Sequence, residues 1–101
     1  MKSEWVASTQ DIPPGKGIKV KLYETHIAIF NHNGYFYAIQ NRCPHQSADL
    51  ADGYIRKNQV HCPMHNWAFD IETGAFAFNP EQKLKTYPVE VHNDNIFITY
   101  D

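Results

Sequence analysis

The chain has 101 residues, of which 43% are apolar and 14% aromatic, so it can fill one small core and we expect a single domain over residues 1–101. Its formal net charge is −2, which argues against a nucleic-acid partner, and no run of about 18 apolar residues predicts a membrane span. The N-terminus lacks the apolar stretch of a signal peptide, so we expect a cytoplasmic protein.

Short runs of alternating apolar and polar residues, rich in Val, Ile, Tyr and Phe, recur along the chain and predict strands. These runs are Ile18–Tyr23, His26–Phe30, Tyr35–Ile39, Thr86–Val91 and Ile96–Tyr100. Turn-forming residues separate them at 13–15, 31–34, 52–53, 73–74 and 93–95. No window shows a long apolar stripe at the 3.6-residue period, so helices should be short or absent. The sequence therefore predicts an all-β fold of small antiparallel sheets.

One further hairpin is predicted in the middle of the chain. Apolar residues flank the polar segment 56–59, which indicates a hairpin over residues 54–61 that turns at 57–58. The residues just outside the two ends of a hairpin lie close together. We therefore expect the loops that begin at Cys43 and Cys62 to emerge at the same end of the fold.

Those two loops carry the side chains with the clearest metal chemistry. The first holds Cys43 and His45, the second holds Cys62 and His65, and each Cys is followed by Pro. A [2Fe–2S] core needs four protein ligands, and a Rieske centre takes two Cys on one iron and two His on the other. Each loop supplies one ligand of each type. We predict one [2Fe–2S] cluster on these four residues, within a cluster-binding region of about residues 41–70.

Three other interpretations of the same residues stay open. The four side chains could be ordinary core and surface residues, although their spacing and the Pro after each Cys disfavour that interpretation. They could bind zinc, but zinc fingers usually pair Cys with Cys and His with His. Cys43 could be a nucleophile, but its neighbours show no activating context. A zinc site would make the chain a binding module without a redox role.

The charge of a Rieske centre predicts its behaviour. Two ferric ions, two sulfides and two thiolates sum to zero, whereas four thiolates would leave the oxidised centre negative. Neutral imidazole ligands therefore ease electron uptake and raise the potential above that of plant-type ferredoxins. The predicted role is to carry single electrons.

Through these ligand residues the chain resembles the Rieske family, and the resemblance extends from Trp5 to Thr99. It implies an all-β fold of three small antiparallel sheets, with the cluster held at the tip by two loops. High-potential members have an extra Cys in each loop, and Ser and Tyr donors two and four residues after the second His ligand. This chain has two Cys in all, with Trp67 and Phe69 at the donor positions, so we expect a potential of about −150 mV rather than about +300 mV.

Two low-potential groups of the family are similar to this chain. Segments 62–67, 70–74 and 85–91 look like the small subunit of the NAD(P)H-dependent assimilatory nitrite reductase, which is the main prediction. The alternative is the ferredoxin of aromatic-ring dioxygenase systems, which more often has Gly where this chain has Asn66. In both cases we expect an electron carrier that is not catalytic alone. Its partner would be a redox protein, either a reductase large subunit or an oxygenase, and the chain would bind no small-molecule substrate itself.

Overall fold

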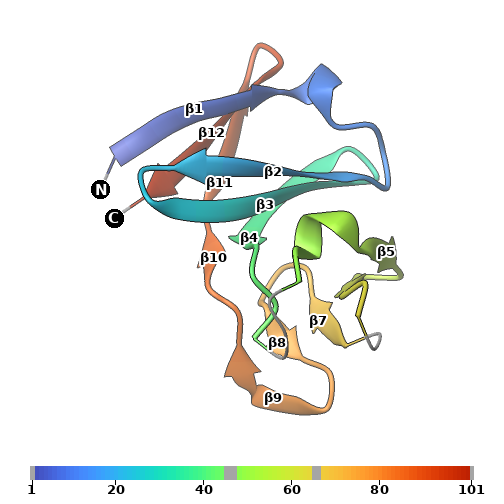
Figure 1. The fold of residues 1–101 in the computed structure, drawn as a ribbon. Coiled ribbons are helices and arrows are strands. Elements are labelled where there is room, and N and C mark those ends of the chain that lie inside the picture. The colour runs from blue at the N-terminus through green and yellow to red at the C-terminus, as the bar shows by residue number, and fades with distance from the viewer. Residues whose placement is uncertain (1, 45–47, 65–66, 101) are drawn as a thin grey trace.

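The computed structural model describes residues 2–44, 48–64 and 67–100, and over these ranges the chain folds as three small antiparallel sheets (Figure 1). The first sheet, in the order β1-β12-β11, contains β1 (Lys2–Ser8), β11 (Val89–His92) and β12 (Asn95–Tyr100). The second, in the order β10-β4-β3-β2, contains β2 (Gly17–Leu22), β3 (Thr25–His32), β4 (Tyr35–Gln40) and β10 (Thr86–Tyr87). The third, in the order β5-β6-β7-β8-β9, contains β5 (Tyr54–Arg56), β6 (Gln59–His61), β7 (Ala68–Asp70), β8 (Ala75–Phe76) and β9 (Asn79–Lys83).

The helical structure of the described residues consists of two short 3₁₀ helices, η1 (Thr9–Asp11) and η2 (Leu50–Asp52). Over the same three ranges, no helix has the length and apolar character needed to cross a membrane. The predictions of an all-β fold, of three sheets and of minimal helix are confirmed.

All five predicted strands correspond to observed strands, with one correction. The predicted strand Thr86–Val91 is in fact two strands, because Pro88 lacks an N–H and interrupts the ladder. β10 pairs with β4 in the second sheet, whereas β11 pairs with β12 in the first sheet. Pro88 is therefore the point at which the chain crosses from one sheet to the other.

The second sheet lies between the other two, and its strand β3 is buried on both faces (Figure 1). Ala28 and Phe30 belong to a core that also contains both cysteines, whereas Ile27 and Ile29 belong to a second core against the first sheet. Successive side chains of a strand point to opposite faces, so β3 reads as a continuous apolar run. Full burial of one large apolar side chain contributes about 1.5–3 kcal/mol, which makes β3 a major source of stability.

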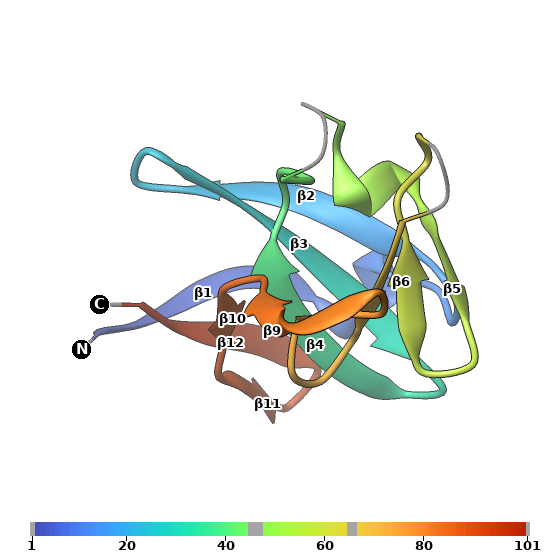
Figure 2. The ribbon, with the colours of Figure 1, turned by 90° about the horizontal axis from the view of Figure 1, so that it is seen from below.

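The hairpin predicted over residues 54–61 is confirmed as β5 and β6. Tyr54 lies opposite His61, and Lys57 has a positive φ of 58° at the turn. Gly53 lets η2 approach β6 closely, because a Cβ at this position would overlap the carbonyl oxygen of His61. Seen from below, the segments that follow β4 and β6 project from the same edge of the molecule, and the β5–β6 turn lies at the opposite edge (Figure 2).

Candidate metal centre

The two cysteines meet at the edge from which these segments project. Cys43 follows β4 and is 1% exposed, whereas Cys62 directly follows β6 and is fully buried. Their thiols are hydrogen-bonded to each other, and both are free of disulfides. The fold therefore brings together two thiols that the sequence separates by a complete hairpin, as the predicted pairing of residues 54–61 requires.

The other two predicted ligands, His45 and His65, lie outside the described residues. Each follows closely on one of the paired thiols in the sequence. Their assignment as ligands stays a prediction, and so does the choice of iron over zinc.

The surroundings of the thiols fit a metal that takes sulfur ligands. Burial raises the pKa of the Cys62 thiol, a hydrogen bond from the backbone of Met64 acts in the opposite direction, and the Cys43 thiol raises it further. A bound cation would replace the thiol protons, because a coordinating thiol is deprotonated outright. Leu50, Val60 and Phe69 pack in the same core and keep water from the sulfur atoms.

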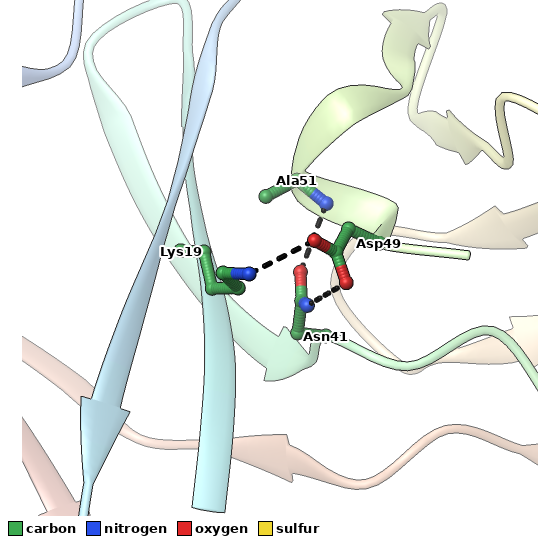
Figure 3. A network of polar contacts seen from close by, with 4 residues as sticks. All are labelled: Lys19, Asn41, Asp49 and Ala51. Atoms are coloured by element: carbon green, nitrogen blue, oxygen red, sulfur yellow. Dashed lines mark hydrogen bonds and ion pairs between the residues drawn. The ribbon is translucent and has the colours of Figure 1, made fainter. Parts of the chain in front are cut away.

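A network of polar contacts centred on Asn41 closes the first metal loop at its base (Figure 3). Asn41 is 2% exposed; its Nδ2 donates to Oδ1 of Asp49 at 2.8 Å, and its Oδ1 accepts from the N–H of Ala51 at 3.1 Å. Its backbone carbonyl accepts from the N–H of Leu50 at 2.7 Å, and its backbone N–H donates to the carbonyl of His26 at 3.2 Å. Asn41 thus binds the end of β4 to the start of η2, across the mouth of the loop that carries Cys43.

Asp49 extends this network to the second sheet. Its Oδ2 accepts from Nζ of Lys19 on β2 at 3.0 Å (Figure 3). The Lys19 ammonium, followed by the amide of Asn41, holds the pKa of the Asp49 carboxyl below its usual value against the effect of burial. Inside the loop, the N–H of Cys43 donates to the carbonyl of Ala48 at 3.0 Å. Hydrogen bonds within the protein therefore fix both ends of the loop.

Replacement of Asn41 by alanine should destabilise the protein by about 2 kcal/mol, because it removes two partly buried hydrogen bonds and leaves the Ala51 N–H without its acceptor. Urea denaturation measures the free energy of unfolding, and the rate of cluster loss at a fixed urea concentration should rise in parallel. Gln10→Ala is the matched control, since Gln10 is exposed on η1 and its replacement should cost no more than about 0.5 kcal/mol. Equal stability of the two variants would contradict the structural role of Asn41.

The second metal loop is closed by a backbone hydrogen bond and by aromatic packing. The N–H of Cys62 donates to the carbonyl of Trp67 at 2.7 Å. The Trp67 ring stacks on Phe76 with a centroid distance of 4.3 Å, and Phe69 contacts the same ring at 5.2 Å. The two positions at which high-potential relatives have hydrogen-bond donors therefore belong to an aromatic cluster, and Phe69, 1% exposed, offers no donor.

Sequence reasoning identified the thiols but missed Asn41 and Asp49. A signal was present, because Asn and Asp are typical of turns and of the ends of 3₁₀ and α-helices, and one precedes and one follows the first metal loop. The position of Asn41 directly after β4 could have drawn attention to it, whereas its burial is seen only in the structure. Without the fold, however, nothing in the sequence indicates that these two side chains contact each other.

The chain is similar to known proteins over most of its length, including both metal loops. A model of the family described as the Rieske [2Fe-2S] domain matches residues 2–88. The 3-phenylpropionate/cinnamic acid dioxygenase ferredoxin subunit of Photorhabdus laumondii is 39% identical over 98% of this chain and 95% of its own length. The ferredoxin component of the naphthalene 1,2-dioxygenase/salicylate 5-hydroxylase systems of a Ralstonia species is 35% identical over 97% of each chain.

Solved structures agree with the observed fold. The ferredoxin of carbazole 1,9a-dioxygenase from Nocardioides aromaticivorans superposes with a TM-score of 0.90 at 25% identity, over all of both chains. A chain from a complex of reduced oxygenase and oxidised ferredoxin of carbazole 1,9a-dioxygenase has a TM-score of 0.85 at 27% identity, over 96% of this chain and 92% of its own. A putative NADH-dependent nitrite reductase small subunit from Mycobacterium tuberculosis has a TM-score of 0.89 at 22% identity, over 100% and 98% of the two chains, which shows a shared fold alone.

Proposed function

Because the chain belongs to the Rieske [2Fe–2S] domain family, we propose that it is the ferredoxin of an aromatic-ring dioxygenase system and passes single electrons to a terminal oxygenase. The carriage of a [2Fe–2S] cluster and a role in electron transfer follow from the family. Its membership of an aromatic-ring dioxygenase system is the proposal. It treats residues 1–101 as one domain whose cluster-binding region spans about residues 41–70.

The observation that supports this choice is identity over the whole chain. Dioxygenase ferredoxins are 39% and 35% identical over nearly all of their own length. The nitrite reductase small subunit reaches 22%, a level that shows a shared fold and carries no argument about function. The sequence-based preference for the nitrite reductase therefore has less support than its alternative. The feature that had counted against a dioxygenase ferredoxin, Asn66, lies outside the described residues.

We propose that Cys43 and Cys62 hold one iron and that His45 and His65 hold the other. When bound, the cluster supplies a one-electron couple, which is what an electron carrier needs. The protein residues exclude water and fix the ligands. The backbone N–H of Met64 donates to the Cys62 sulfur, and a donor to a ligand sulfur favours the more negative reduced state.

Reconstitution of a dioxygenase system tests this function. The purified protein is combined with NADH, with a flavin-containing ferredoxin reductase and with the terminal oxygenase of a 3-phenylpropionate/cinnamic acid or a naphthalene dioxygenase system, and hydroxylated product is measured. We expect product formation to depend on the concentration of this chain and to fall to background when it is omitted. A cluster-loaded protein that supports neither oxygenase but restores electron flow to a nitrite reductase large subunit would overturn the proposal.

A further inference from the structure

Two hollows flank the first metal loop, one on each side of Cys43. The first has a volume of about 440 Å³ and is lined in part by Pro44, Trp67 and Lys83. The second has a volume of about 460 Å³ and is lined in part by Arg42, by Lys85 and by one acidic residue, Glu24. Because Arg42 and Pro44 directly precede and follow Cys43, both hollows border the metal site, and each contributes at least one exposed cation.

The side chain of Gln40 forms hydrogen bonds with the backbones of both basic residues of the second hollow, Arg42 and Lys85. Its Nε2 donates to the carbonyl of Arg42 at 3.0 Å, and its Oε1 accepts from the N–H of Lys85 at 2.8 Å. Its backbone N–H donates to the carbonyl of Lys85, also at 2.8 Å. Three hydrogen bonds of one residue therefore fix the backbones of Arg42 and Lys85 relative to each other, next to Cys43.

Lys83 and Lys85 are fixed on the same side of their segment. Leu84 between them is 3% exposed and packs in the core around the cysteines, and its N–H donates to the carbonyl of Gly74 at 2.9 Å. With Leu84 directed inward, the exposed side chains on either side of it are directed outward. Lys83 then borders one hollow and Lys85 the other, which makes a basic strip along the metal loop.

The lysines of this strip differ from those of β2 in their partners. Lys19 and Lys21 form ion pairs with carboxylates. Among the described residues, no carboxylate lies within ion-pair distance of Lys83 or Lys85, and Nζ of Lys85 lies 5.3 Å from the centre of the Tyr87 ring. The positive charges of Lys83 and Lys85 therefore face outward, although the chain as a whole has a net charge of −2.

We propose that this basic strip, formed by Lys83 and Lys85, docks a carboxylate-bearing surface of the terminal oxygenase that receives the electron. The proposal rests on the proposed function and names the surface that serves it. Complementary charges at the rim of an interface accelerate encounter and fix orientation, and their effect falls as salt rises. Because the strip lies beside the metal loop, docking there would bring the cluster close to the oxygenase. Electron transfer between the two proteins needs a short distance between their redox centres.

The test measures electron delivery by rapid mixing. Protein reduced by dithionite, with excess reductant removed, is mixed with oxidised terminal oxygenase of the two dioxygenase systems named above, over a range of salt concentrations. We expect the double variant Lys83→Gln/Lys85→Gln to lower the second-order rate constant roughly tenfold at low salt and to flatten its salt dependence. Its midpoint potential should equal that of the unmodified protein.

The matched control is Lys16→Gln/Lys57→Gln, which removes the same charge. Both residues are exposed, and Lys57 lies at the hairpin turn opposite the metal loops (Figure 2). The carbonyl of Lys16 accepts from the N–H of Asn31, which pairs with Phe36 near the start of β4, whereas Cys43 follows the other end of that strand. The control should retain the normal rate constant and salt dependence. Equal rates in the two double variants would overturn the docking strip, as would a loss confined to electron uptake from the reductase. Failure of the unmodified protein to reduce either oxygenase would instead overturn the proposed function, and the docking strip with it.

Discussion

Serine in place of Cys62 should yield a chain that no longer retains the [2Fe–2S] cluster. Cys62 is fully buried and hydrogen-bonded to the Cys43 thiol, so both sulfur atoms face the same small volume. A serine hydroxyl is a hard, weakly acidic group, whereas iron–sulfur clusters select soft thiolates. Iron and acid-labile sulfide per chain should both fall at least about tenfold, with loss of the red-brown absorbance. Far-UV circular dichroism establishes whether the sheets are kept.

His61→Gln is the matched control for this substitution. His61 directly precedes Cys62, but its ring stacks on Tyr54 at 4.7 Å, and burial followed by the charge of Arg56 lowers its pKa. We expect this variant to keep the full iron content and spectrum. Normal iron content in Cys62→Ser would refute the role of Cys62. One equivalent of zinc and a colourless unmodified protein would establish the zinc interpretation instead.

The sequence predicted those parts of the fold whose signal is local. Strand β4, with Tyr35–Ile39 as its apolar run, and the hairpin of residues 54–61 each show alternation bounded by turn residues, and both were predicted within a residue or two. Strand β9 was missed because all five of its residues are exposed and polar or Pro, so it has no apolar face. Strand β1 was missed for another reason, since its partner β12 comes from the opposite end of the chain.

The same distinction between local and non-local signals holds for the metal centre. The hairpin predicted over residues 54–61 was sufficient to predict that the loops of Cys43 and Cys62 meet, because it is a local feature that separates them. The contact between Asn41 and Asp49 depends on how η2 folds back on the end of β4. The pattern of apolar and polar residues in the sequence does not predict this arrangement. The preference between two related electron carriers rested on short segments around the second loop. Identity over nearly the whole chain, 39% with a dioxygenase ferredoxin subunit, gives the alternative more support than those segments give the nitrite reductase.

The aromatic residues behind the second loop predict the reduction potential. The Rieske range runs from about −150 to about +300 mV, and donors to the cluster sulfurs raise the value because they stabilise the added negative charge. Phe69 is 1% exposed, packs in the core that contains Cys43 and Cys62, and has no donor atom. We therefore expect a midpoint near the low end, about −150 mV, in a redox titration followed by electron paramagnetic resonance. A midpoint above zero would contradict this expectation.

Phe69→Tyr should raise that midpoint, because its hydroxyl enters the space beside the sulfur atoms. A hydrogen bond that is stronger in the reduced state by about 1 kcal/mol raises a one-electron potential by about 40 mV. Phe97→Tyr on β12, which belongs to the sheet far from the metal loops, adds the same hydroxyl and should leave the potential unchanged. Equal potentials in both variants would mean that the hydroxyl at position 69 does not reach the cluster. A shift confined to Phe69→Tyr would identify the missing donor at this position as one cause of the low potential, independently of which partner receives the electron.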